Sequence, residues 1–168
     1  MSVTYTCSVC GLVHDGLPLS WGPDAPDMWA KLSPDEQALR GEAGTDQTVI
    51  DDRHFFIRGR LEDPITETGE TFAWLVWVEV SADDFFKMSN LWTVEGRETK
   101  AEPYDGRLAN NLGIYKEPTL GLPVKVQTRR VGERPLVQIL GEHQLRDEQL
   151  RGITLHRVQE VYQRFISG

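Results

Sequence analysis

Residues 72–80 read FAWLVWVEV, and this run is the most strongly strand-like stretch of the chain. Apolar side chains fill both of its faces until Glu79, which is typical of a strand that is buried on both sides. Trp74 and Trp77 differ by an odd number of positions, so their side chains face opposite sides of the strand. The run therefore predicts the central strand of a sheet with a covered face on each side.

The segments around this strand predict an α+β fold. The segment 54–61 reads HFFIRGRL and forms an antiparallel pair with 72–80 through a loop. The other expected strands are 3–7, 48–50 and a hairpin of 124–128 with 136–140. Helices are expected at 33–41, 83–91 and 154–166, capped by Ser33, by the segment 81–84 and by Thr154, and a short one at 107–112.

The expected architecture is one domain over residues 1–168, with a central, mainly antiparallel sheet and flanking helices. Residues 1–20 form a zinc-knuckle-like turn and a loop, which pack on an α+β core at 45–168. A chain of 168 residues is long enough to bury a core without disulfide bonds.

The formal net charge of -8 argues against a general nucleic-acid-binding protein, which needs a basic surface. Residues 1–84 carry a charge of -11 and residues 85–168 a charge of +3. Two readings stay open: two differently charged faces of one domain, or an acidic face that binds a basic protein partner. The N-terminus lacks a signal peptide, and no apolar run approaches the length of a membrane span. We therefore expect a cytoplasmic protein that does not bind membranes.

The segment Cys7-x2-Cys10-Gly11-x2-His14 is the most distinctive chemical feature of the sequence. Two residues between the cysteines let both sulfur atoms reach one ion, and the glycine accepts the tight turn. His14 is a candidate third zinc ligand and His54, at the start of a strand, a candidate fourth. Two alternatives stay open: reduced, buried cysteines without metal, or a redox pair.

A second group of residues is a candidate anion or ligand site: Asp51, Asp52, Arg58, Arg60 and Trp77. Carboxylates and guanidinium groups near one strand, with an aromatic ring on the strand that pairs with it, can bind an anion. The alternative is an ordinary strand face on which the arginines pair with nearby acids.

The sequence contains none of the common phosphate-loop, dinucleotide, zinc-protease or serine-hydrolase motifs. The lack of these catalytic motifs favours a non-enzymatic binding or interaction module that holds a structural zinc at the Cys/His turn. The alternative is a small metal-dependent hydrolase, in which the same turn leaves one coordination position for water.

Five motifs spread over nearly the whole chain carry a resemblance to a known family. They are the Cys/His segment followed by Leu17-Pro18, TDQTVID at 45–51, HFFIRG at 54–59, Leu61-Glu62-x-Pro64-Ile65, and Trp74-x2-Trp77-Val78. Together they resemble the uncharacterised bacterial family catalogued as domain of unknown function 2199, which implies no particular activity. The resemblance also implies a cysteine where this chain has Thr48, a poor zinc ligand, and so an incomplete metal site.

Overall fold

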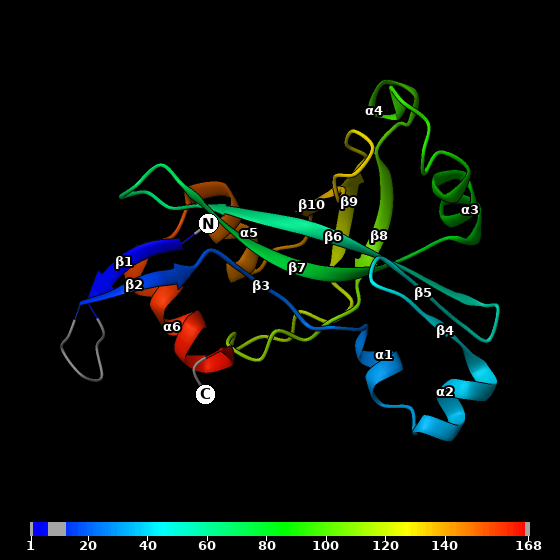
Figure 1. Cartoon of the computed structure of the whole chain (residues 1–168), viewed down its shortest axis with the longest axis horizontal. Coiled ribbons are helices and arrows are strands. Elements are labelled where there is room, and N and C mark those ends of the chain that lie inside the picture. The colour runs from blue at the N-terminus through cyan, green and yellow to red at the C-terminus, as the bar shows by residue number, and fades with distance from the viewer. Residues whose placement is uncertain (1, 7–12, 167–168) are drawn as a thin grey trace.

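A closed five-stranded β-barrel forms the centre of the computed structural model, which describes residues 2–6 and 13–166 (Figure 1). Its strands are β6 (His54–Pro64), β7 (Thr71–Val80), β8 (Tyr104–Leu108), β9 (Pro123–Gln127) and β10 (Leu136–Ile139). Each strand pairs antiparallel with the next one along the chain. The ring closes where β10 lies parallel to β6, with Leu136 opposite Arg60.

The long β6–β7 pair divides the apolar residues between two cores. On one face Ile57, Leu61, Trp74 and their alternate neighbours fill the main core. On the other face Trp77 packs in a smaller cluster with Ile50, Phe56 and Ala109, beside Trp29 and Leu32. The prediction that Trp74 and Trp77 face opposite sides is confirmed, and each side is covered.

Short strands extend the barrel at two edges. β5 (Gln47–Ile50) pairs with the first part of β6, and β4 (Gly41–Ala43) pairs with β5. β3 (Ser20–Trp21) adds to β7 in parallel. β1 (Ser2–Thr6) and β2 (Val13–Pro18) form a separate two-stranded sheet at the opposite end of the β6–β7 pair from β4 and β5 (Figure 1).

Six helices surround the sheet in the described part of the chain: α1 (Asp27–Ala30), α2 (Pro34–Arg40), α3 (Ala82–Asn90), α4 (Arg97–Lys100), α5 (Gln144–Arg151) and α6 (Leu155–Phe165). The N-terminus of α2 is a capping box, in which Ser33 and Glu36 satisfy each other's backbone N–H groups. α6 buries Val158 and Val161 against the main core. None of the described helices is long and apolar enough to cross a membrane.

The mixture of sheet and helices agrees with the predicted α+β class, and the three longer predicted helices match α2, α3 and α6. The sheet differs from the prediction because it closes into a barrel. Closure depends on the pairing of residues 60 and 136, which are distant in sequence and leave no local signature. The helix predicted at 107–112 is wrong: β8 ends at Leu108, which pairs with Val78 on the buried strand β7.

Candidate anion-binding site

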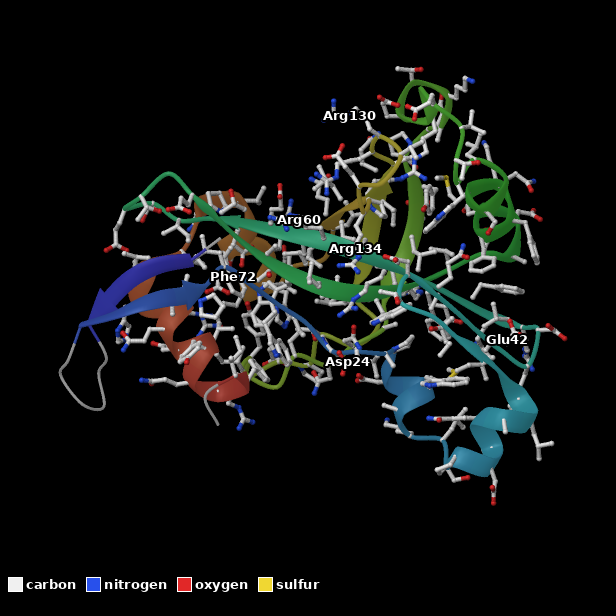
Figure 2. All side chains as sticks on the ribbon, viewed as in Figure 1. Asp24, Glu42, Arg60, Phe72, Arg130 and Arg134 are labelled. Carbon is white, nitrogen blue, oxygen red and sulfur yellow. The ribbon has the colours of Figure 1, made fainter. Side chains whose placement is uncertain are left out.

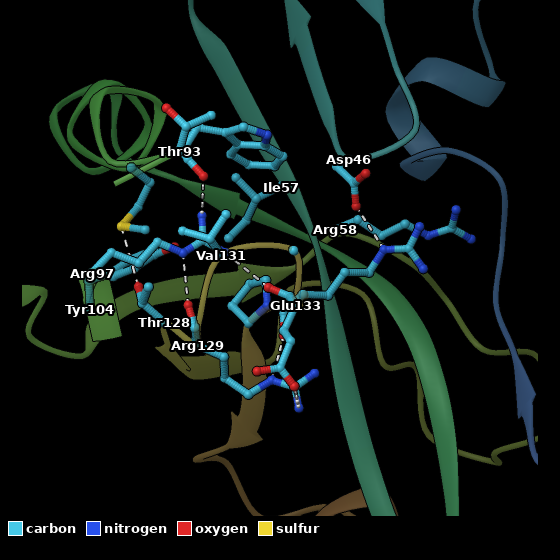
Figure 3. Close-up of a pocket in the computed structure, with 15 residues that line it drawn as sticks. Asp46, Ile57, Arg58, Thr93, Arg97, Tyr104, Thr128, Arg129, Val131 and Glu133 are labelled. Atoms are coloured by element: carbon cyan, nitrogen blue, oxygen red, sulfur yellow. Dashed lines mark hydrogen bonds and ion pairs between the residues drawn. The ribbon is translucent and has the colours of Figure 1, made fainter. Parts of the chain in front are cut away.

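The candidate site lies where β6 changes its neighbour. β5 pairs with β6 as far as Ile57, and β10 pairs with it at Arg60. Between these points the Arg58 N–H donates to the Asp46 carbonyl at 3.0 Å, and the Arg60 N–H donates to the Pro135 carbonyl at 2.8 Å. The separation of β5 from the β9–β10 connection leaves a cavity of about 320 Å³ (Figure 3). This volume is at the small end of the range for ligand pockets.

Arg97 builds one wall of this cavity. Its side chain is buried, with a relative exposure of 5%, and it donates hydrogen bonds to four backbone carbonyls, which belong to Trp92, Arg129, Arg130 and Glu133. The four distances lie between 2.8 and 3.1 Å. Carbonyl dipoles stabilise a buried guanidinium where no carboxylate is present. Arg97 therefore fixes the β9–β10 connection to the segment before α4 (Figure 3).

Two further arginines of the lining have carboxylate partners. The Arg134 Nε lies 2.7 Å from the Asp46 carboxylate, and both side chains are about one-third exposed. Arg129 lies 3.6 Å from the Glu133 carboxylate. Arg134 lies over β6, whereas Arg130 lies at the far end of the β9–β10 connection (Figure 2).

Arg58 also lines the cavity, and the charges that act on its guanidinium are those of Arg134, Asp24 and Asp46. One of its Nη atoms donates to the Pro23 carbonyl at 2.8 Å, and its guanidinium lies 5.6 Å from the centre of the Trp77 ring. Among the described residues no carboxylate forms an ion pair with it. Burial, and after it the charge of Arg134, lowers the pKa of Arg58 from its ordinary value. A half-buried cation beside a second cation favours the binding of an anion.

The rest of the lining is mainly apolar. It comes from strands β6 and β8, helix α3, and the α3–α4 and β9–β10 connections, and it contains Ile57, Met88, Trp92, Tyr104, Val131 and Pro135. Trp92 is 45% exposed at the rim, although tryptophan is usually more buried. The site thus combines a small number of placed charges with an apolar wall, which is the usual composition of a small-molecule pocket.

The structure brings two residues of the predicted anion site together, namely Arg58 and Trp77. Arg60 lies two positions further along β6, forms a 2.6 Å ion pair with Glu62 and does not line the cavity. Asp51 and Asp52 form the turn between β5 and β6, with φ angles of 57° and 48°. The Asp51 carboxylate lies 2.7 Å from Arg40, outside the cavity.

The predicted metal site stays a prediction, because Cys7 and Cys10 lie outside the described residues and only the backbone of His14, in β2, is described. The structure does not bring His54 toward β2. The β1–β2 hairpin leads into β3, which pairs with Trp74, whereas His54 lies 2.8 Å from Glu79. Trp74 and Glu79 are five residues apart on β7, which corresponds to about 17 Å along an extended strand. His54 is therefore far from the hairpin that carries His14.

Thr48 also lies at this far end, opposite Phe56, and its side chain is buried. In the described ranges no three His, Cys, Asp or Glu residues are grouped as metal ligands would be.

A second charged cluster joins Asp63 of β6 to Glu148 of α5 and Arg157 of α6. Asp63 continues the inward-facing alternation of Leu61 on β6, and its side chain is fully buried. Glu148 accepts a hydrogen bond from the Tyr115 hydroxyl at 2.5 Å and lies 2.8 Å from Arg157. Burial, and after it the charge of Glu148, raises the pKa of Asp63 to about 8.

Sequence reasoning missed most of the arginine cavity, because its charged residues come from segments far apart: Asp46, Arg97, Arg129, Glu133 and Arg134. Four of the residues between 129 and 134 are charged, on a hairpin connection, and this density was the one available signal. Asp63 had a clearer sequence signal, because it falls on the inward-facing side of a strand in which buried and exposed positions alternate strongly.

Comparison with known proteins identifies the family. Residues 6–153 match the model of a family described as "Uncharacterized protein conserved in bacteria (DUF2199)". A search of curated proteins and a search of solved structures gave no match. The resemblance predicted from the motifs is confirmed, and this chain belongs to the DUF2199 family of uncharacterized bacterial proteins.

Proposed function

We propose that this protein is a non-enzymatic binding module and that it binds an anionic ligand in the arginine-lined cavity. The observation that carries the proposal is Arg58, a half-buried guanidinium with no carboxylate partner among the described residues, beside the guanidinium of Arg134. The cavity is lined by four arginines and only two carboxylates, in a chain whose net charge is -8. This local reversal of charge supports an anion as the ligand.

The neighbouring contacts hold the Arg58 side chain in place before a ligand arrives. The Pro23 carbonyl and the Trp77 ring restrain its guanidinium, and Arg97 restrains the connection that carries Arg134. Preorganised side chains lose less conformational entropy when a ligand binds. A guanidinium also presents two parallel N–H groups to a carboxylate or phosphate, which strengthens the contact and fixes its direction.

The Arg58→Gln variant tests this function. In an NMR titration of labelled protein with benzoate at low ionic strength, we expect the dissociation constant to rise roughly tenfold or more, because a charge-assisted contact is lost. Arg60→Gln is the matched control, since it removes the same charge from the same face of the same strand, outside the cavity. Equal affinities of wild type and Arg58→Gln for benzoate, acetate and phosphate would overturn the proposal.

Two proposals concern the Cys7–His14 segment and a partner. We propose a structural zinc at this segment on the strength of its ligand spacing; a small metal-dependent hydrolase at the same place is the alternative. Metal content per chain, measured on protein purified without a metal column, tests both.

The basic protein partner is supported only by the charge of residues 1–84, and co-purification of a partner tests it.

A further inference from the structure

We propose that the ligand of the cavity is a small aromatic monoanion, whose carboxylate binds Arg58 and replaces Asp46 as the partner of Arg134. This inference rests on the proposed function and adds the class of ligand and an internal competitor. Three observations carry it: the distribution of charge among the arginines, the position of the Asp46 carboxylate, and the composition of the wall.

The distribution of charge favours a monoanion. Arg129 pairs with Glu133, Arg134 pairs with Asp46, and Arg97 is satisfied by four carbonyls. Arg58 is then the one guanidinium of the lining that has no ion pair among the described residues and does not donate to four backbone carbonyls as Arg97 does. A single carboxylate neutralises one such charge, whereas a phosphate dianion brings a second negative charge next to Asp46 and Glu133.

Asp46 holds the position that a ligand carboxylate would take. Its side chain reaches Arg134 from the connection between β4 and β5, while its backbone carbonyl accepts the hydrogen bond from the Arg58 N–H. The carboxylate is therefore bound to Arg134, and its charge also acts on Arg58. Because the Asp46–Arg134 pair is about one-third exposed, it is weak enough to be exchanged for a ligand.

The apolar wall favours a flat hydrophobic body on the ligand. Ile57, Met88 and Val131 supply aliphatic surface, and the exposed ring of Trp92 stands at the rim. An aromatic ring gains most from such a wall, through buried area and ring stacking. The volume of about 320 Å³ admits one or two rings and excludes a folded peptide segment.

The test compares four probes by NMR titration: 1-naphthoate, acetate, 2-naphthylmethanol and phenyl phosphate. We expect 1-naphthoate to bind roughly tenfold or more tightly than each of the other three probes. Acetate lacks the aromatic ring, 2-naphthylmethanol lacks the negative charge, and phenyl phosphate adds a second negative charge. The Asp46→Asn variant should bind 1-naphthoate several-fold more tightly than wild type, because the competing carboxylate is removed. Glu42→Gln, which changes an exposed carboxylate on β4 outside the cavity, should leave the affinity unchanged.

The outcomes separate the inference from the proposed function. Acetate binding as tightly as 1-naphthoate, or phenyl phosphate binding more tightly, overturns the aromatic monoanion while the anion site stands. Asp46→Asn binding 1-naphthoate no better than wild type overturns the role of Asp46. If none of the three anions binds with an affinity that depends on Arg58, both the inference and the proposed function fail.

Discussion

Replacing Asp63 with asparagine is expected to stabilise the protein, by an amount that grows with pH. The side chain is fully buried, and no hydrogen bond of ordinary geometry reaches either carboxyl oxygen from the described residues. Trp74 and Arg157 favour the charged form, but burial and Glu148 outweigh them and raise the pKa to about 8. An ionised Asp63 is therefore costly, and asparagine has nearly the same shape without the charge.

The sign of the pH dependence of this stabilisation follows from the raised pKa of Asp63. The unfolded chain releases the proton near pH 4, whereas the folded protein keeps it until about pH 8. The stability that the protonated carboxyl contributes is complete below about pH 4 and is lost as the pH rises to about 8, at about 1.4 kcal/mol per unit. At pH 8 the gain from Asp63→Asn should be on the order of 3 to 5 kcal/mol, and at pH 5 on the order of 1 kcal/mol.

Urea unfolding of wild type and Asp63→Asn at pH 5, 6.5 and 8 measures this difference. Asp147→Asn is the control, because Asp147 is an exposed aspartate on the neighbouring helix α5. Its effect on the free energy of unfolding should be small and nearly independent of pH. A difference between wild type and Asp63→Asn that stays constant from pH 5 to pH 8 would contradict the buried, protonated carboxyl.

Replacing Arg97 with leucine is expected to destabilise the protein by about 3 kcal/mol or more. The change removes the donors for four carbonyls, and buried carbonyls without partners cost about 1 to 3 kcal/mol each, less what water restores. The β9–β10 connection should loosen, so hydrogen exchange at residues 129–134 should accelerate. Benzoate affinity should fall as well, since that connection positions Arg134.

The matched control is Arg107→Leu. Arg107 lies on β8, and its side chain makes one long hydrogen bond, 3.3 Å to the Gly121 carbonyl, so the change in stability should stay within about 0.5 kcal/mol. Arg97→Lys should give an intermediate loss, because an ammonium group has three donors for four carbonyls. A loss below 0.5 kcal/mol for Arg97→Leu, roughly the scale of an ordinary surface change, would show that the carbonyl contacts are not structural.

The sequence predicted the elements that have a local signature. The run 72–80 has a strongly apolar pattern, and the helix at Ser33 begins with a complete capping box, so both could be located without knowledge of the fold. Barrel closure was not predictable in this way, because it depends on Leu136 and Arg60 lying side by side. The short strand β8 contains Gly106 and Arg107, and it is held in extended form by its buried neighbours.

In the candidate site, too, the residues on strands with a local signature were predicted and the residues that depend on long-range contacts were not. Arg58 and Trp77 were found because they lie on strands that the sequence located, and cross-strand pairing places them together. Asp46, Arg97 and Arg134 reach the cavity from the β4–β5 connection, the start of helix α4 and the β9–β10 connection, whose relative positions only the folded chain determines. The Cys/His segment was the clearest motif in the sequence, and it lies largely outside the described residues.

The most direct test of the arginine-lined cavity as a ligand site is a crystal structure of the protein with 4-bromobenzoate, in which the bromine is located by its anomalous scattering. We predict the carboxylate within hydrogen-bond distance of the Arg58 guanidinium, the bromine among Ile57, Met88 and Val131, and the Asp46 carboxylate withdrawn from Arg134. Bromobenzoate bound only elsewhere, with Asp46 still paired to Arg134, would contradict the proposed site.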